Sequence, residues 1–236
     1  MDAYIVLDLE TTGLSPQQDR ILEIGALKVE EDRITDRYQT LINPDLQIPY
    51  AVQRLTGITQ AMAEQGEKPE KGIGDFLDFC GDLPLLGHNI LFDYSFVRCE
   101  AAALGWNFEK AGTDTLKIAR KFLPDLESRS LESMCRHYHI AQEHAHRAMD
   151  DALSTWQLFL SLKKEFFEDR PEEFYPQKLV CRVKKHSPAT NSQKLYLNDL
   201  IKYHRIVTDI EIGSMTKSEA SRMIDRIILQ YGRIKR

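Results

Sequence analysis

The chain has 236 residues, of which 42% are hydrophobic and 28% charged, and its mean hydropathy is −0.40. This composition is typical of a soluble globular protein and argues against a disordered or membrane protein. No apolar run approaches the roughly 18 residues of a membrane span, and the first residues lack a basic segment followed by a cleavage site. We therefore expect a cytoplasmic protein with no membrane partner.

Charge is distributed unevenly along the chain. Residues 178–236 carry 13 Lys and Arg against 5 Asp and Glu, whereas residues 1–177 carry 18 against 31. Opposite signs on this scale indicate a basic tail that faces nucleic acid or an acidic partner, attached to an acidic body. A solvated basic helix face is the simpler explanation, and both interpretations stay open.

The four cysteines argue against a zinc or redox site. They are widely spaced and form no C-x-x-C pair, so free buried thiols are expected. The stretch from Cys135 to His146 has the residue types of a metal cluster, but we do not expect it to bind zinc.

Hydrophobic patterning predicts strands first and helices afterwards. Residues 4–8, 20–30 and 33–43 are rich in Ile, Val and Leu and are separated by turn residues, which predicts a three-stranded meander. A short strand is expected over 85–87. Apolar residues at helical spacing predict helices over 69–80, 91–105, 115–122, 130–138 and 147–168. This order favours an α/β fold with a mixed sheet flanked by helices.

A break in the pattern predicts a domain boundary. Charge and proline combine between residues 168 and 176, so we expect the core domain to span 1–170. We expect a linker over 171–189 and a small basic helical module over 190–236, with helices at 191–203 and 217–231. The last helix carries an apolar stripe, which must pack against another surface.

The first candidate functional motif lies where the first strand ends. Asp8 and Glu10 flank Leu9, and strand alternation directs both carboxylates to the same face. Oxygen ligands of this kind suit Mg²⁺ or Mn²⁺. An isolated acidic pair is usually only solvated, but Thr11-Thr12-Gly13 follows at once, and small residues there would let a substrate approach the backbone.

Two further motifs each open a predicted helix. One is His88-Asn89-Ile90-Leu91-Phe92-Asp93, in which Asp93 could simply stabilise a helix N-terminus. The other runs from His146 to Ala152 and includes Asp150 and Asp151. Residues five apart are not neighbours on a helix, so His146 and Asp151 share a site only if His146 precedes the helix. A loop histidine, with an ordinary pKa near 6.5, suits a general base.

Together the motifs D-L-E-T-T-G, H-N-I-L-F-D-Y-S-F and H-R-A-M-D-D-A resemble those of the DEDDh, or DnaQ-like, 3′→5′ exonucleases. This family includes the proofreading epsilon subunits of bacterial DNA polymerase III. The resemblance covers residues 3–165 and implies a ribonuclease-H-like fold. It implies that His146 is the general base and that four acids bind metal: Asp8, Glu10, Asp93 and Asp151.

The family pattern H-x-A-x-x-D selects Asp151, although the adjacent Asp150 would replace it after a one-residue error in helix phase. The resemblance also implies substrate contacts from five residues: Thr11, Thr12, His88, Asn89 and Phe92. Phe92 has a second interpretation as a packing residue, because aromatic residues at helical spacing usually face a core.

The implied reaction is hydrolysis at a free 3′ end, assisted by two Mg²⁺ or Mn²⁺ ions, with release of nucleoside monophosphates. Single-stranded DNA is the expected substrate, and a DNA polymerase or a repair protein is a possible partner. One alternative is an RNA-trimming exoribonuclease, since no motif residue reports on a 2′-hydroxyl. Others are a polymerase accessory protein that retains the fold, and a tail that acts as a DNA-binding or dimerisation module.

Overall fold

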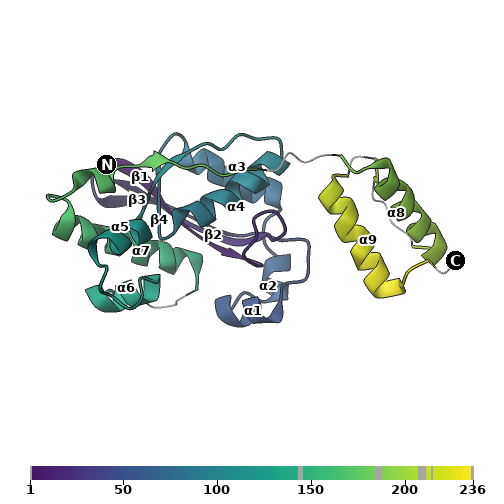
Figure 1. Cartoon of the computed structure of the whole chain (residues 1–236), viewed down its shortest axis with the longest axis horizontal. Coiled ribbons are helices and arrows are strands. Elements are labelled where there is room, and N and C mark those ends of the chain that lie inside the picture. The colour runs from purple at the N-terminus through teal and green to yellow at the C-terminus, as the bar shows by residue number, and fades with distance from the viewer. Residues whose placement is uncertain (1, 143–145, 184–187, 207–210, 214, 235–236) are drawn as a thin grey trace. The chain divides into compact units, whose positions relative to one another are not determined.

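The computed structural model describes residues 2–142, 146–183, 188–206, 211–213 and 215–234, without the side chains of residues 218, 219 and 222 (Figure 1). The chain forms two compact units, Met1–Val183 and Lys184–Arg236. Among the described residues, no helix is long and apolar enough to cross a membrane.

The first unit is built on a mixed sheet, as the sequence predicted. Its strand order in the described residues is β3-β2-β1-β4-β5-β6. The strands β1 to β3 form the expected antiparallel meander, β4 and β5 are parallel to β1, and β6 pairs antiparallel with β5. The bounds are β1 Ala3–Thr11, β2 Ile21–Glu30, β3 Arg33–Leu41, β4 Leu85–Gly87, β5 Ala111–Asp114 and β6 Gln177–Lys178.

Helices cover both faces of this sheet (Figure 1). Ile5, Leu7 and Leu9 of β1 belong to the core that α3 and α4 complete, whereas Tyr4 and Val6 belong to the core on the side of α5, α6 and α7. Strand alternation therefore places Asp8 and Glu10 toward α7. The helices are α3 Pro69–Cys80, α4 Ile90–Ala103, α5 Thr115–Phe122, α6 Leu131–Tyr138 and α7 Ala148–Phe166.

All five long helices predicted for this unit are present, within two residues at each end. The unit also contains shorter elements that hydrophobic patterning does not predict: α1 Tyr50–Thr56, α2 Gln60–Glu64, η1 Pro171–Phe174, β5 and β6. The missed helices α1, α2 and η1 are shorter than the window in which helical periodicity can be recognised. The strand β5, for example, has the sequence Ala-Gly-Thr-Asp and is defined by its pairing with β4.

The first unit continues past the boundary expected at residue 170. Phe174 is buried against the core, β6 extends the sheet, and Leu179 packs in the core of α3 and α4. The segment 171–189, which we expected to be a linker, thus contributes residues to the folded unit as far as Val183.

The second unit consists of α8 Asn191–His204 and α9 Lys217–Tyr231, which match the two helices predicted there. Leu197, Leu200 and Ile227 form its buried centre. The helices run parallel, because Gln193 near the start of α8 bonds to the Lys217 carbonyl at the start of α9, and His204 at the end of α8 bonds to the carbonyl of Gly232.

One glycine sets the distance between α7 and the sheet. A Cβ added to Gly25 of β2 would lie 2.2 Å from the carbonyl carbon of Ala148 and 2.4 Å from the nitrogen of Met149. These are backbone atoms of the first turn of α7, so they cannot move aside as a side chain can. Only glycine permits this contact.

We expect Gly25→Ala to destabilise the protein by about 3 kcal/mol or more, because overpacking against backbone forces the whole helix to shift. Gly74→Ala is the matched control, since its Cβ would meet only the Trp106 ring at an ordinary 3.4 Å. Denaturant unfolding of both variants measures the difference. Equal stability of the two variants would contradict the proposed contact.

Candidate active site

The site is centred on the end of β1. Asp8 lies opposite Gly25 in the β1–β2 register, and Glu10 lies opposite Glu23. Glu10 is only 9% exposed. Both carboxylates line one pocket, as their predicted common strand face requires. The two acids of the first motif are therefore adjacent and largely withdrawn from water.

The second motif adds Asp93 from α4. Asp93 lies in the first turn of this helix, as predicted, and is 4% exposed. Its Oδ1 accepts a hydrogen bond of 3.1 Å from the backbone nitrogen of Leu9. Because Leu9 lies between Asp8 and Glu10, this bond fixes the Asp93 carboxylate beside the other two acids.

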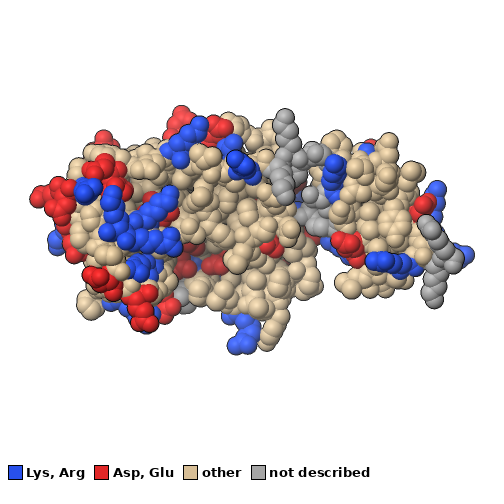
Figure 2. Space-filling view, in the orientation of Figure 1, with Lys and Arg blue, Asp and Glu red and all other residues tan. Residues whose placement is uncertain are grey.

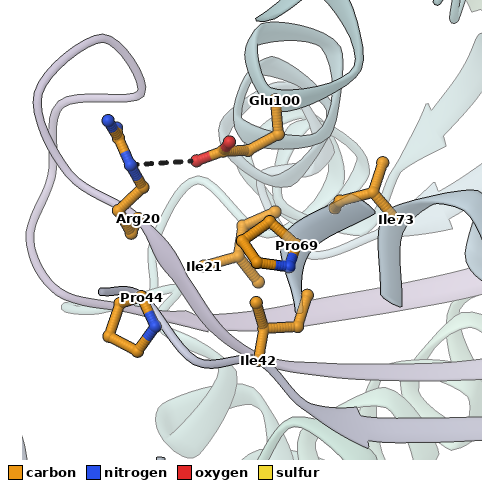
Figure 3. Close-up of a pocket in the computed structure, with 7 residues that line it drawn as sticks. All are labelled: Arg20, Ile21, Ile42, Pro44, Pro69, Ile73 and Glu100. Carbon is orange, nitrogen blue, oxygen red and sulfur yellow. Dashed lines mark ion pairs between the residues drawn. The ribbon is translucent and has the colours of Figure 1, made fainter. Parts of the chain in front are cut away.

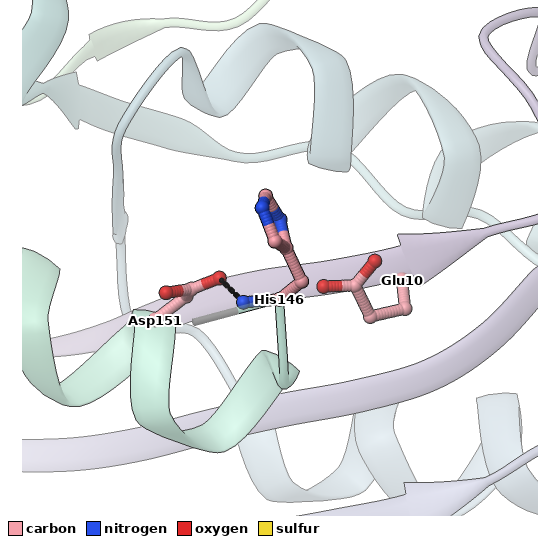
Figure 4. A group of neighbouring side chains, drawn as sticks. All are labelled: Glu10, His146 and Asp151. Atoms are coloured by element: carbon pink, nitrogen blue, oxygen red, sulfur yellow. Dashed lines mark hydrogen bonds between the residues drawn. The ribbon is translucent and has the colours of Figure 1, made fainter. Parts of the chain in front are cut away.

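The third motif adds Asp151 and His146. His146 precedes α7, as a shared site requires, and its backbone nitrogen donates a 3.0 Å hydrogen bond to Oδ2 of Asp151. Candidate ligand atoms of Glu10, His146 and Asp151 all lie within 4.8 Å of one another. Figure 4 shows the two carboxylates on either side of the histidine. Asp151, rather than Asp150, lines the pocket.

The pocket thus brings together all five residues predicted to be catalytic. They come from β1, α4 and the start of α7, three elements that are far apart in the sequence. The remaining lining residues include two of the predicted substrate contacts and several residues of the α6 region. They are Leu9, His88, Phe92, Ser130, Leu131, Glu132 and Gln142.

The family comparison covers the part of the chain that contains all three motifs. The profile of the RNase_T family, described as exonuclease, matches residues 5–159 of the chain. The chain belongs to this exonuclease family. The epsilon subunit of DNA polymerase III from Aquifex aeolicus is 32% identical over 165 residues, which cover 70% of this chain and 82% of that protein.

Other relatives are much longer than this exonuclease. The PolC-type DNA polymerase III of Thermotoga maritima is 42% identical over 158 residues, or 66% of this chain. The chain spans only 12 to 14% of the length of such PolC-type relatives. The similarity therefore concerns one domain of those polymerases.

Solved structures share the fold of the exonuclease unit. E. coli exonuclease I in complex with a dA16 oligonucleotide has a TM-score of 0.62 at 19% identity, over 74% of this chain and 42% of that one. A 3′-exonuclease that recognises a histone mRNA stem-loop has a TM-score of 0.60 at 16% identity, over 78% and 72%. At these identities the likeness concerns the fold, which is the ribonuclease-H-like fold that the sequence predicted.

The two threonines predicted to contact substrate shape the turn after β1. Thr11 donates through Oγ1 to the carbonyl of Gly13 at 2.7 Å. Thr12 is 4% exposed, and its Oγ1 accepts a bond from the Arg20 nitrogen. Arg20 in turn forms a 3.7 Å ion pair with Glu100 of α4, beside a small apolar pocket (Figure 3). This turn of the exonuclease is therefore tied to α4.

The other predicted substrate contacts differ in how they are placed. Phe92 lines the pocket, with its ring 5.0 Å from that of Phe96, so it packs and faces the pocket at once. Asn89 is exposed, has a left-handed backbone with φ of 70°, and does not line this pocket. Its backbone nitrogen bonds to Asp114.

Both ring nitrogens of His88 are already bonded within the protein. Nδ1 lies 2.9 Å from the Thr115 hydroxyl, and Nε2 lies 2.8 Å from the carbonyl oxygen of Arg129. Burial lowers the pKa of this imidazole, so the neutral form is favoured. In the neutral form Nε2 donates to Arg129 and Nδ1 accepts from Thr115. His88 can therefore meet a substrate through its ring carbons rather than through a free nitrogen.

An ion pair that no sequence motif predicts anchors the start of α7. Glu23 is fully buried, and Arg147 donates to it through Nε at 3.0 Å and through a terminal nitrogen at 2.7 Å. The nitrogen of Ala148 and the amide of Gln39 also donate to this carboxylate. Burial raises the pKa of Glu23, but these bonds outweigh burial and lower it. The only signal in the sequence is a single acid within the apolar run Ile21–Val29.

Burial and mutual repulsion oppose ionisation of the site. Burial, followed by the charges of Asp93 and Asp151, raises the pKa of Asp8 well above its ordinary value, and burial does the same for Asp93. Burial, together with the charges of Asp151 and Glu23, raises the pKa of Glu10 to about 8. Burial also raises the pKa of Asp151. Such a cluster of oxygen donors fits hard divalent cations, which would offset the repulsion.

Without divalent ions, we expect the free energy of unfolding to fall by about 1–3 kcal/mol between pH 5 and pH 8. The pKa of Glu10 is 4.5 when unperturbed and about 8 in the fold. Between these values the native state keeps a proton that the unfolded state has released, so rising pH destabilises the fold. Denaturant unfolding in EDTA at both pH values measures the change.

Glu10→Gln should reduce this pH dependence, and excess Mg²⁺ at pH 8 should stabilise the parent protein, because a bound cation favours the folded state. Asp150→Asn is the control, since Asp150 does not line the pocket. A parent protein whose stability is flat between pH 5 and pH 8 would show that these acids are already neutralised by other means.

Proposed function

We propose that this chain is a metal-dependent 3′→5′ exonuclease that hydrolyses single-stranded DNA from a free 3′ end and releases nucleoside monophosphates. The observation that carries the proposal is the convergence of four carboxylates and His146, from three elements, on one pocket. Family membership supports the same reaction class. We assign the carboxylates of Asp8, Glu10, Asp93 and Asp151 to metal binding.

The donor set suits two Mg²⁺ or Mn²⁺ ions, since these ions prefer carboxylate oxygens and water. When bound, such ions activate a water molecule and stabilise the leaving 3′ oxygen. The raised pKa values of Asp8 and Glu10 support this assignment, because carboxylates that repel one another gain most from a cation between them.

His146 is the proposed general base. Its side chain is exposed at the pocket while its backbone is held by the bond to Asp151, so the imidazole can reach water without losing its position. A positioned histidine that takes the proton of the attacking water contributes about 10²–10⁴-fold to a rate. Phe92 is the proposed stacking surface for the terminal base, because its ring lines the same pocket.

The names of the relatives support DNA as the substrate and a replicative polymerase as a possible partner. An exoribonuclease is the second candidate, because the fold also occurs in an exonuclease whose title names histone mRNA. An accessory protein without activity is less well supported, since such a protein has no need to keep all five candidate catalytic residues.

The parent protein should shorten a 5′-labelled single-stranded DNA oligomer from its 3′ end in single-nucleotide steps, with Mg²⁺ or Mn²⁺ and not with EDTA. We expect Asp8→Ala to lower the rate by about 10²-fold or more, because a metal ligand is lost. Asp150→Ala is the matched control and should keep the parent's rate. Denaturing gel electrophoresis resolves the products.

The same assay separates the alternatives. Digestion of an RNA oligomer of the same sequence, with the DNA left intact, would favour the exoribonuclease. Inactivity on both, with folded protein and both metals tested, would favour the accessory protein. Internal fragments instead of a ladder would contradict the proposed direction, and a strong effect of Asp150→Ala would move the ligand from Asp151 to its neighbour.

His146→Asn tests the general base separately. His146 has φ of 65°, and asparagine tolerates this left-handed conformation better than alanine does, so the backbone bond to Asp151 should survive. We expect kcat to fall by about 10²–10⁴-fold with little change in stability. His137→Ala, at an exposed position of α6, is the control. An unchanged kcat in His146→Asn would exclude this role.

A further inference from the structure

The parallel arrangement of α8 and α9 gathers two distant pieces of sequence at one end of the second unit. In a parallel pair, both helix C-termini lie at the same end. His204, the last residue of α8, accordingly bonds through Nε2 to the carbonyl of Gly232, which follows the last residue of α9, at 2.9 Å.

Aromatic side chains are exposed at this end. The rings of Tyr203 and Tyr231 both lie near His204, with centroids 4.9 Å and 5.5 Å from that of the histidine. Tyr203 is 49% exposed and Tyr231 is 48% exposed. If these rings only packed the core of the unit, they would be buried as Leu197 and Leu200 are, but about half of each tyrosine is exposed. Two aromatic surfaces are therefore open to solvent within one short stretch of the surface.

Exposed basic residues lie within two positions of each tyrosine in the sequence. Lys202 and Arg205 flank the end of α8, Arg233 follows α9, and all three are exposed. In the described part of the chain, none of them forms an ion pair with a carboxylate. Cations near helix C-termini also complement the helix dipole, which accounts for their sign but not for the exposed tyrosines. The nearest acid on the same side of α8 is Asp199, one turn earlier.

We propose that this surface, made of Lys202, Tyr203, Arg205, Tyr231 and Arg233 and here named the Tyr203–Tyr231 face, binds single-stranded nucleic acid. Bases stack on the two tyrosine rings while the basic side chains contact phosphates, the combination that suits strands without sequence preference. The identity of the partner rests on the proposed function, because an exonuclease substrate is such a strand.

The charge of the chain agrees with this assignment. Residues 184–236 carry 11 Lys and Arg against 5 Asp and Glu, whereas residues 1–183 carry 20 against 31. Lys and Arg side chains are seen on the visible face of the second unit (Figure 2). The acidic exonuclease unit repels phosphate at long range. A basic unit on the same polypeptide therefore raises the local concentration of a nucleic acid strand.

Binding is measured on the full chain by fluorescence anisotropy of a 5′-labelled 30-nucleotide single-stranded DNA in EDTA, where no hydrolysis occurs. We expect Tyr203→Ala with Tyr231→Ala to weaken binding about fivefold or more, the loss that one stacked base accounts for. Arg205→Glu with Arg233→Glu should reduce the slope of log affinity against log salt by about 1.4, since each phosphate contact on a single strand contributes about 0.7.

Two matched variants control for charge and for folding. The variant with Lys217→Glu and Arg226→Glu makes the same change of charge. Lys217 is at the start of α9, and Arg226 is on the side of that helix away from Tyr231. This variant should keep the parent's salt slope. Tyr203→Phe with Tyr231→Phe keeps the rings and should bind like the parent. Thermal unfolding identifies any variant whose second unit has lost its structure.

Hydrolysis of a trinucleotide with Mg²⁺, assayed in parallel, distinguishes this proposal from the proposed function. Parent-like binding by the folded alanine variant, or an equal loss in the Lys217–Arg226 control, would overturn the role of the Tyr203–Tyr231 face while leaving hydrolysis intact. Face-dependent binding without any hydrolysis would support the face and contradict the proposed function. Altered self-association without altered DNA binding would assign the face to a second copy of the chain.

Discussion

The candidate site depends on how closely the start of α7 approaches β2. Gly25 lets the backbone at Ala148 and Met149 lie against the strand, and the Glu23–Arg147 pair holds it there. Gly25 lies opposite Asp8 in the sheet. The contact that seats the helix therefore also sets how far Asp151 lies from the acids of β1. A wider separation would remove Asp151 and His146 from the acids of β1 and leave the pocket without its third motif.

A second constraint is electrostatic. Four carboxylates withdrawn from water repel one another, and the fold offsets part of that cost locally. Asp93 and Asp151 both lie in the first turn of a helix, where backbone N–H groups favour negative charge. Both also accept a backbone hydrogen bond from another segment, from Leu9 and from His146. Asp8 and Glu10 are on a strand, which has no such dipole. A bound cation would therefore stabilise the ionised forms of these two carboxylates most.

The sequence predicted those parts of the fold that repeat a pattern over many residues, such as β1 to β3 and the long helix α7. It also predicted that His146 must precede that helix, because a five-residue separation cannot place two side chains on one helical face. It missed β5 and β6, which are defined by their partners. It missed the Glu23–Arg147 pair as well, since the two residues are 124 positions apart and no local pattern links them.

In the second unit, too, local sequence patterns predict the helices but not how they pair. Each helix was predicted from its own apolar stripe, but the stripe leaves open whether two helices run parallel or antiparallel. The direction follows from contacts at the two ends, Gln193 with Lys217 and His204 with Gly232. It has a functional consequence, because an antiparallel pair would place Tyr203 and Tyr231 at opposite ends. In the parallel pair, both tyrosine rings lie near His204, at the end of the unit where Lys202, Arg205 and Arg233 are also exposed.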